Sequence, residues 1–231
     1  MANKNTISAN ENINSPKTAT ILVAFLVIVL NVLVTKILPL LDKNISLKND
    51  TDIINRTFYL VAGGVIALFI WKTPLTFNLD ALKIHDKKKF KKETLISAVV
   101  SFVLILGMLV FRVFLNRISP VAASRPAFGL YLNIHARWFY PLNVILQEAV
   151  IKGLMQENFR TLNPEGNQHF SIWVNGLFFM ILHMNYPLYY MVGAGILCIA
   201  TGYIYEHYRD IWGSSLIHFV IGFMPRALGL K

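Results

Sequence analysis

Long apolar runs constrain this chain more than any other feature of its sequence. A helix of about 20 apolar residues crosses the roughly 30 Å hydrocarbon core of a bilayer. Hydrophobic residues make up 55% of the chain and charged residues 15%, which is far from the composition of a soluble globular protein. The alternating pattern of a membrane barrel is missing. The sequence therefore predicts an all-α, polytopic transmembrane helical bundle of about seven spans, at residues 18–41, 57–71, 93–115, 138–159, 170–184, 186–206 and 211–224.

The first 17 residues differ in composition from the rest of the chain. Residues 1–17 are polar and rich in Asn, so we expect a disordered N-terminal leader there. The first apolar run is too long for the central region of a cleavable signal peptide. Residues 18–231 are expected to form a single transmembrane bundle.

Positive charge is concentrated in one predicted loop. The chain carries 22 Lys and Arg against 12 Asp and Glu, a net charge of +10. Seven lysines fall between two predicted spans: Lys72, Lys83, Lys87, Lys88, Lys89, Lys91 and Lys92. The positive-inside rule places this loop, and with it the N-terminus, in the cytoplasm of a multi-pass cell-membrane protein. No interleaved aromatic residues or binding motif support a nucleic-acid partner, so we expect the lysines to meet the lipid bilayer.

The cysteine content limits the chemistry that is available. Cys198 is the one cysteine, which excludes an intrachain disulfide and a Cys-based metal cluster. Ala194, Cys198 and Gly202 recur every four residues, a spacing that favours close helix packing. We therefore interpret Cys198 as a packing residue.

The run 138–159 contains Gln147, Glu148 and Lys152 among apolar residues. A carboxylate at membrane depth is costly, and it usually faces a protein interior or a watery cavity. In a helix Glu148 and Lys152 stand at positions i and i+4, where they can pair. This pattern fits two interpretations. The residues form a functional site, or they form an ion pair that only joins helices.

Two histidines extend the polar pattern to other spans. His183 and His218 lie in the fifth and seventh apolar runs, and Glu148 is predicted to be the one deeply placed carboxylate. Each histidine alone fits an interhelical hydrogen bond. Together the three residues predict one hydrated pocket within the bundle.

The residues around these groups form three short motifs. Gln147 begins QEAVIKG, Phe179 begins FMILH and ends at His183, and GYIYEHYRDIWGSSLIH ends at His218. In order, spacing and surrounding sequence they resemble the CPBP family of intramembrane proteases, over residues 138–224. This family includes prenyl-protein CAAX endopeptidases and bacteriocin-processing or immunity proteins.

The resemblance implies a mechanism. In the family a glutamate and the histidine of the second motif hold and deprotonate a water molecule. The histidine of the third motif and a following Asn or Asp stabilise the oxyanion. Transferred to this sequence, Glu148 is the base, His183 its water partner and His218 the oxyanion donor, with no cofactor. As an alternative, these three residues could hold a divalent metal, as in His₂Glu zinc sites, although no HExxH motif is present.

Three positions depart from the family pattern. Gln147 stands where the first glutamate is expected, Lys152 replaces an arginine, and Gly222 replaces the Asn or Asp that follows the last histidine. A neutral amide cannot take a proton from water, and glycine offers no side-chain donor. Two functions therefore stay open: an endopeptidase of a peptide or membrane-anchored substrate, or a catalytically impaired member that serves as a bacteriocin self-immunity or membrane scaffold protein. A small-molecule transporter is a third alternative, which the absence of a visible internal repeat disfavours.

Overall fold

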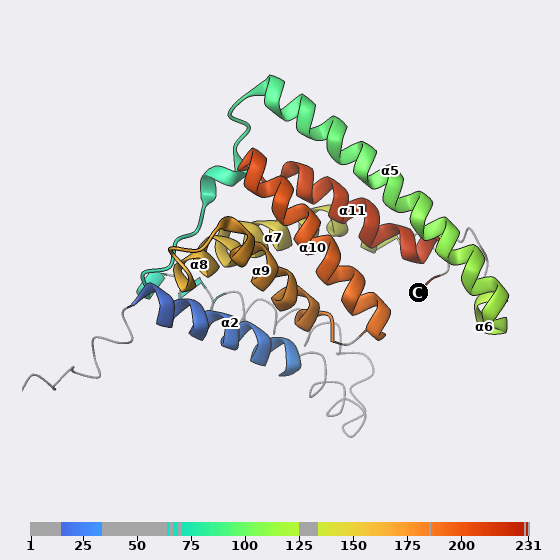
Figure 1. Cartoon of the computed structure of the whole chain (residues 1–231), viewed down its shortest axis with the longest axis horizontal. Helices are drawn as coiled ribbons and strands as arrows, with labels where there is room; N and C mark the ends of the chain where they lie inside the picture. Colours follow the sequence, from blue (N-terminus) through green and yellow to red (C-terminus); the bar gives the residue numbers. More distant parts are fainter. Residues whose placement is uncertain are drawn as a thin grey trace, which may run out of the picture. The chain divides into compact units, whose positions relative to one another are not determined.

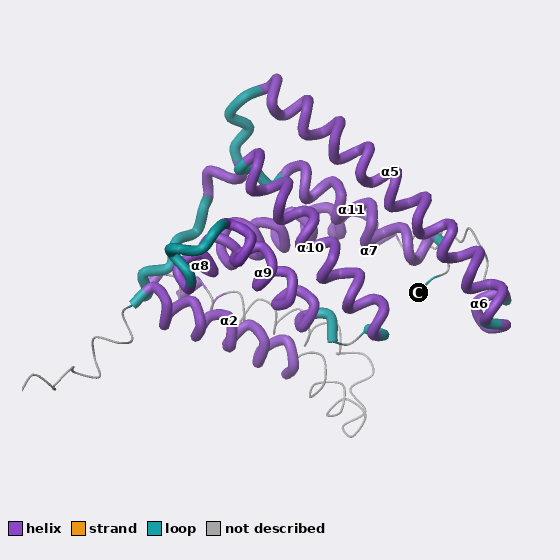
Figure 2. Tube along the Cα trace, viewed as in Figure 1, coloured by secondary structure: helices purple, strands orange, loops and turns teal. Residues whose placement is uncertain are grey.

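The protein is described from a computed structural model, which describes residues 15–33, 64, 67–68, 71–124, 134–184, 186–228 and 230. All regular elements within these residues are helical, as Figure 2 shows, so the all-α prediction is confirmed. They are α2 (Pro16–Val32), η2 (Leu79–Leu82), α5 (Lys87–Ile118), α6 (Pro120–Ala123), α7 (Ile134–Glu148), η3 (Ala149–Gln156), α8 (Glu157–Phe159), η4 (Arg160–Leu162), α9 (Gln168–Leu182), α10 (Leu188–Tyr208) and α11 (Trp212–Ala227).

Five of the predicted spans coincide with described helices: 93–115 with α5, 138–159 with α7 to α8, 170–184 with α9, 186–206 with α10 and 211–224 with α11. The helices α5 and α10 are long and apolar enough to cross a membrane. The first span corresponds to α2 up to its end at Val32. Residues 1–14 of the leader, the end of the first span and most of the second span lie outside the described residues.

The chain forms two compact units. Unit 1 comprises residues 1–78 and 154–199, and unit 2 comprises residues 79–153 and 200–231. Each unit is therefore assembled from two separate stretches of chain.

In unit 1, α2 contacts α8, η4 and α9 (Figure 1). The helix begins after Ser15, whose hydroxyl accepts a hydrogen bond from the Thr18 N–H, as expected of an N-cap residue. Near its other end, Asn31 donates from Nδ2 to the carbonyl of Leu182 on α9, at 3.1 Å. A side-chain bond at its far end thus fixes α2 against α9.

Unit 1 also contains a buried asparagine that links two distant segments. Asn158 donates from Nδ2 to the carbonyl of Thr76 (2.7 Å), and its Oδ1 accepts from the Thr76 N–H (3.1 Å). Nδ2 also donates to the carbonyl of Leu154 (2.7 Å). One side chain therefore satisfies both backbone groups of Thr76.

The helix α9 packs closely on the part of α10 that belongs to unit 1. A Cβ atom at Gly176 would meet the side chain of Ile199, and it would lie 3.2 Å from the carbonyl oxygen of Gly195. Cys198 is buried there, with Sγ 3.7 Å from the Asn175 carbonyl oxygen. These contacts are those of a packing residue, in agreement with the interpretation of Cys198.

In unit 2, α11 lies along α5 (Figure 1). The carboxylate of Glu93 on α5 accepts a hydrogen bond at Oε1 from the N–H of Gly213 in the first turn of α11, at 2.9 Å. Asp210 accepts from the N–H of Trp212 at 3.1 Å. Two carboxyl groups therefore satisfy donors at the start of α11.

The fully buried Glu93 corrects the expectation that Glu148 is the one deeply placed carboxylate. The sequence places Glu93 at the predicted margin of a span. In the structure α5 begins at Lys87 instead, after the N-cap residue Asp86, so that Glu93 lies in the second turn of the helix.

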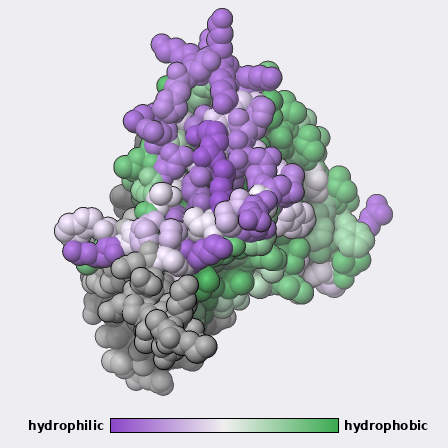
Figure 3. Space-filling view, turned by 60° about the vertical axis from the view of Figure 1, so that its left-hand side comes forward, coloured by the Kyte–Doolittle hydropathy of each residue, from purple (hydrophilic) through white to green (hydrophobic). Residues whose placement is uncertain are grey.

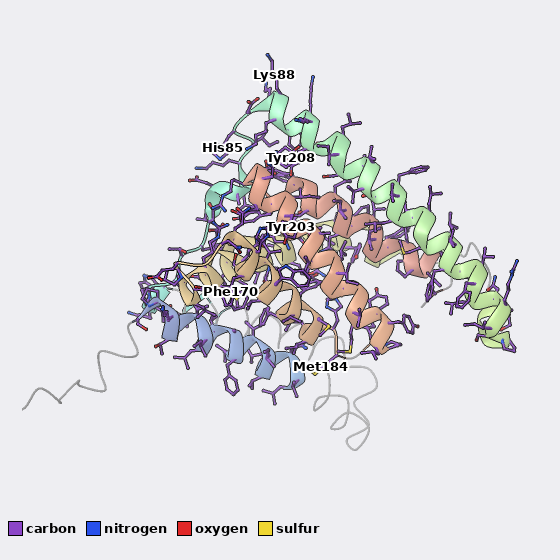
Figure 4. All side chains as sticks on the ribbon, in the orientation of Figure 1. His85, Lys88, Phe170, Met184, Tyr203 and Tyr208 are labelled. Atoms are coloured by element: carbon purple, nitrogen blue, oxygen red, sulfur yellow. The ribbon has the colours of Figure 1, made fainter. Side chains whose placement is uncertain are left out.

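The lysine-rich start of α5 is tied to the end of α10. Lys89 donates from Nζ to the Tyr208 carbonyl at 3.0 Å, and Figure 4 shows Lys88 at the outer tip of this end. Figure 3 shows hydrophilic residues at the top, where α5 begins, and hydrophobic residues on the sides below. This lysine-rich end is therefore a polar surface.

Beyond its lysines, α5 presents apolar side chains outward. The exposed ones are Leu95, Ile96, Val99, Phe102, Val103, Leu104, Leu106, Val110, Phe111, Val113, Phe114 and Ile118. Water would not stabilise such a continuous apolar surface, whereas lipid would. The exposed face of α5 is thus that of a membrane helix.

Candidate functional site

The predicted residues Glu148 and His218 meet in unit 2. Glu148 is the last residue of α7 and His218 lies on α11, yet Oε1 of Glu148 and Nδ1 of His218 are 2.7 Å apart. The two residues are 3% and 8% exposed, respectively. An ionised carboxylate can only accept, so Nδ1 donates the proton of this hydrogen bond. The result is a buried and oriented acid–imidazole pair.

The second oxygen of Glu148 has a different environment. Oε2 is buried and has no hydrogen-bond partner among the described residues. Lys152, whose side chain is fully buried, and Ser214 lie close enough to interact electrostatically with this carboxylate. The sequence indicated the proximity of Lys152 from its spacing, but it gave no signal for Ser214.

The helix widens directly after Glu148. Residues Ala149–Gln156 form a π-helix, in which backbone bonds join residues five apart. The sequence predicted an ordinary helix here, because side-chain propensities do not separate the two forms. Segments of π-helix are rare and are often found at functional sites.

Prolines lie inside two of the helices that form the site. The margins of the predicted spans placed Pro141 and Pro225 at helix ends, but the structure has Pro141 within α7 and Pro225 within α11. Pro141 lies inside α7 because this helix begins at Ile134, before the apolar run starts. Proline removes a backbone donor and commonly bends a helix.

Gly222 lies one turn after His218, and the space beside it is filled by Tyr140. A Cβ atom at Gly222 would overlap the Tyr140 hydroxyl, and it would stand 3.7 Å from Cδ2 of His218. The Tyr140 ring packs on Phe219, with 5.7 Å between ring centroids. Sequence reasoning missed Tyr140, because it reads as an aromatic residue at a predicted span margin.

The remaining predicted residues His183 and Phe179 belong to unit 1. His183 ends α9, and its Nδ1 lies 2.9 Å from the Phe179 carbonyl oxygen. A carbonyl only accepts, so Nδ1 donates this hydrogen bond. Three aromatic rings surround this imidazole, those of Phe179, Tyr186 and Tyr190. The motif FMILH indicated the ring of Phe179, but sequence reasoning missed the two tyrosines.

Two further predictions concern Gln147 and a bound metal ion. Gln147 is half-buried at the end of α7. Glu148 and His218 carry a carboxylate and an imidazole, which are groups that bind divalent metals. Within the part of the chain that the structure describes, no group of three or more His, Cys, Asp or Glu side chains is placed to hold a metal ion.

Comparison with known proteins gives one match. The family model described as type II CAAX prenyl endopeptidase Rce1-like matches residues 109–224. This range contains Tyr140, the Glu148–His218 pair and His183. Searches of curated proteins and of solved structures found no match.

Proposed function

This chain belongs to the Rce1-like family of type II CAAX prenyl endopeptidases, and from that premise we propose that it is an intramembrane endopeptidase. It hydrolyses peptide bonds of a peptide or membrane-anchored substrate. The observation that carries this proposal is the buried Glu148–His218 pair, in which one carboxylate oxygen orients the imidazole and the other has no partner among the described residues. A buried base beside an oriented donor is what hydrolysis by activated water needs.

The reaction uses the two oxygens of Glu148 for different tasks. Oε1 holds His218, while Oε2 takes a proton from water as the water oxygen bonds to the scissile carbonyl carbon. In this mechanism the Nε2–H of the imidazolium form of His218 donates to the oxyanion that forms. The C–N bond then breaks, and Glu148 returns its proton to the leaving amine. His183 is assigned the part of water partner on the family pattern.

The membrane arrangement is part of the proposal. The apolar helices α5 and α10, together with the shorter apolar helices α2 and α9, support a multi-pass bundle of about seven spans that takes in residues 18–231. The lysines at the start of α5 support a cytoplasmic location for this end and for the N-terminus. Water activation proceeds without a metal or other cofactor.

A peptidase assay with purified protein tests the proposal. Fluorogenic peptides and a membrane-anchored substrate are given to the wild type and to Glu148→Gln, His183→Ala and His218→Ala. Each variant should lose cleavage by about 10²-fold or more, because each removes a group used in the transition state. Glu93→Gln is the matched control, since it replaces another buried carboxyl group of unit 2 by its amide and should keep activity. Unchanged cleavage in Glu148→Gln would refute the proposal, and loss of activity with a chelator would favour the metal alternative.

The second candidate is a catalytically impaired member that acts in bacteriocin self-immunity or as a membrane scaffold. Gln147 and Gly222 favour it, since both lack a group that the family pattern supplies. Under this alternative, protection of cells against a bacteriocin or partner binding survives His218→Ala, and purified wild type cleaves no substrate. Loss of protection in that variant would argue against it.

A further inference from the structure

The structure points to Tyr140 as a side-chain donor of the oxyanion site, and we propose that its hydroxyl takes the place of the Asn or Asp that Gly222 lacks. This inference rests on the proposed peptidase function. It explains how a chain with glycine at this position can retain the chemistry. It also assigns a role to a residue that lies outside the three motifs.

The hydroxyl of Tyr140 lies where a side chain at position 222 would begin. An ideal Cβ atom built on Gly222 would overlap Oη of Tyr140. The hydroxyl therefore occupies the volume into which any side chain at position 222 would project. An Asn or Asp side chain there would need the space that Tyr140 fills.

Position 222 also adjoins the imidazole of His218. Cδ2 of His218 lies 3.7 Å from that same Cβ position. Cδ2 is bonded to Nε2, the ring nitrogen that is not used by Glu148, since Glu148 contacts Nδ1. Position 222, and the hydroxyl that fills it, therefore lie beside the Cδ2 edge of the imidazole, next to the nitrogen to which the oxyanion is assigned.

The Tyr140 hydroxyl has the chemistry that this role requires. A phenol O–H donates a hydrogen bond, as an amide N–H does. The ring is held by its packing on Phe219, so the donor is preorganised. Removal of one such donor typically costs about 10²- to 10³-fold in kcat.

The test begins with Tyr140→Phe, which removes the hydroxyl and keeps the ring. We expect kcat to fall by about 10²- to 10³-fold, with KM changed less than about threefold and an unchanged unfolding temperature in detergent. Tyr203→Phe on α10 is the matched control and should retain kcat. A ring that only fills space would give wild-type kcat in Tyr140→Phe, and that result would overturn the inference.

A second variant tests whether position 222 and Tyr140 share one task. Gly222→Asn alone introduces a side chain into the volume of the hydroxyl, and it should lower both stability and activity. In the double variant Tyr140→Phe/Gly222→Asn the amide gains room, and kcat should rise at least tenfold above that of Tyr140→Phe. A double variant no more active than Tyr140→Phe, in protein that folds, would contradict the shared role.

The outcomes separate the two proposals. Wild-type cleavage that is lost in Glu148→Gln but kept in Tyr140→Phe overturns the inference about Tyr140 and leaves the peptidase function in place. No cleavage by the wild type overturns both.

Discussion

The imidazole of His218 and the carboxylate of Glu148 form a buried pair at 2.7 Å, although 70 residues separate them in the chain. Removal of one partner of a buried pair leaves a polar group without compensation, at a cost of about 3–5 kcal/mol. We therefore expect Glu148→Ala and His218→Ala each to lower the free energy of unfolding strongly. The double variant should lose less than the sum of the two. Equilibrium unfolding in mixed detergent micelles measures this cycle, and strictly additive losses would show that the pair carries no coupling energy.

Asn158 should be a stability residue of unit 1. Replacement by alanine leaves the two backbone groups of Thr76 without their partner, so Asn158→Ala should cost about 1–3 kcal/mol. Asn143→Ala is the control, because Asn143 is exposed on α7, and it should shift the free energy of unfolding by less than about 0.5 kcal/mol. The same unfolding experiment compares the two, and equal effects would refute the role of Asn158.

The contact of α5 with α11 at Gly213 leaves no room for a methyl group. In Gly213→Ala the added Cβ would overlap Oε1 of Glu93, and it would lie 2.6 Å from Ser97 Oγ. We expect a loss of about 1–3 kcal/mol from this overpacking. Gly107→Ala is the matched control on α5, since nothing lies within 4 Å of its Cβ position. It should be neutral or stabilising by up to about 1 kcal/mol. A thermal scan of both proteins distinguishes them.

The lysine-rich end of α5 should face the cytoplasm. In a Cys198→Ser background, Lys88→Cys places one thiol at an exposed position of this end. A membrane-impermeant maleimide should label it after the cells are opened and not in intact cells. Labelling in intact cells would reverse the proposed orientation, while the background protein without the new cysteine reports non-specific reaction.

The helices were predictable because each corresponds to a local sequence pattern, an apolar run flanked by polar residues. The match of residues 186–206 to α10 illustrates this. Boundaries were less predictable, since hydropathy does not record caps. With Asp86 as its N-cap residue, α5 begins at Lys87, six residues before the predicted span, and Glu93 therefore lies inside the helix.

The site was predictable only in part, for a different physical reason. Glu148, His183 and His218 stand out as polar residues in apolar runs, so the sequence could nominate them. Which atoms meet depends on packing between segments far apart in the chain, and no local pattern encodes the approach of Tyr140 to Gly222. The π-helix after Glu148 is hidden for a related reason, because its residues would also suit an α-helix.

The length of α5 has a consequence for the choice of bilayer. Its 32 residues extend about 48 Å at 1.5 Å per residue, whereas the hydrocarbon core is about 30 Å thick. The helix must therefore tilt, or carry its first turns into the headgroup layer, where the lysines would meet phosphate groups. Reconstitution into lipids of graded acyl length should consequently reveal an optimum thickness for this protein.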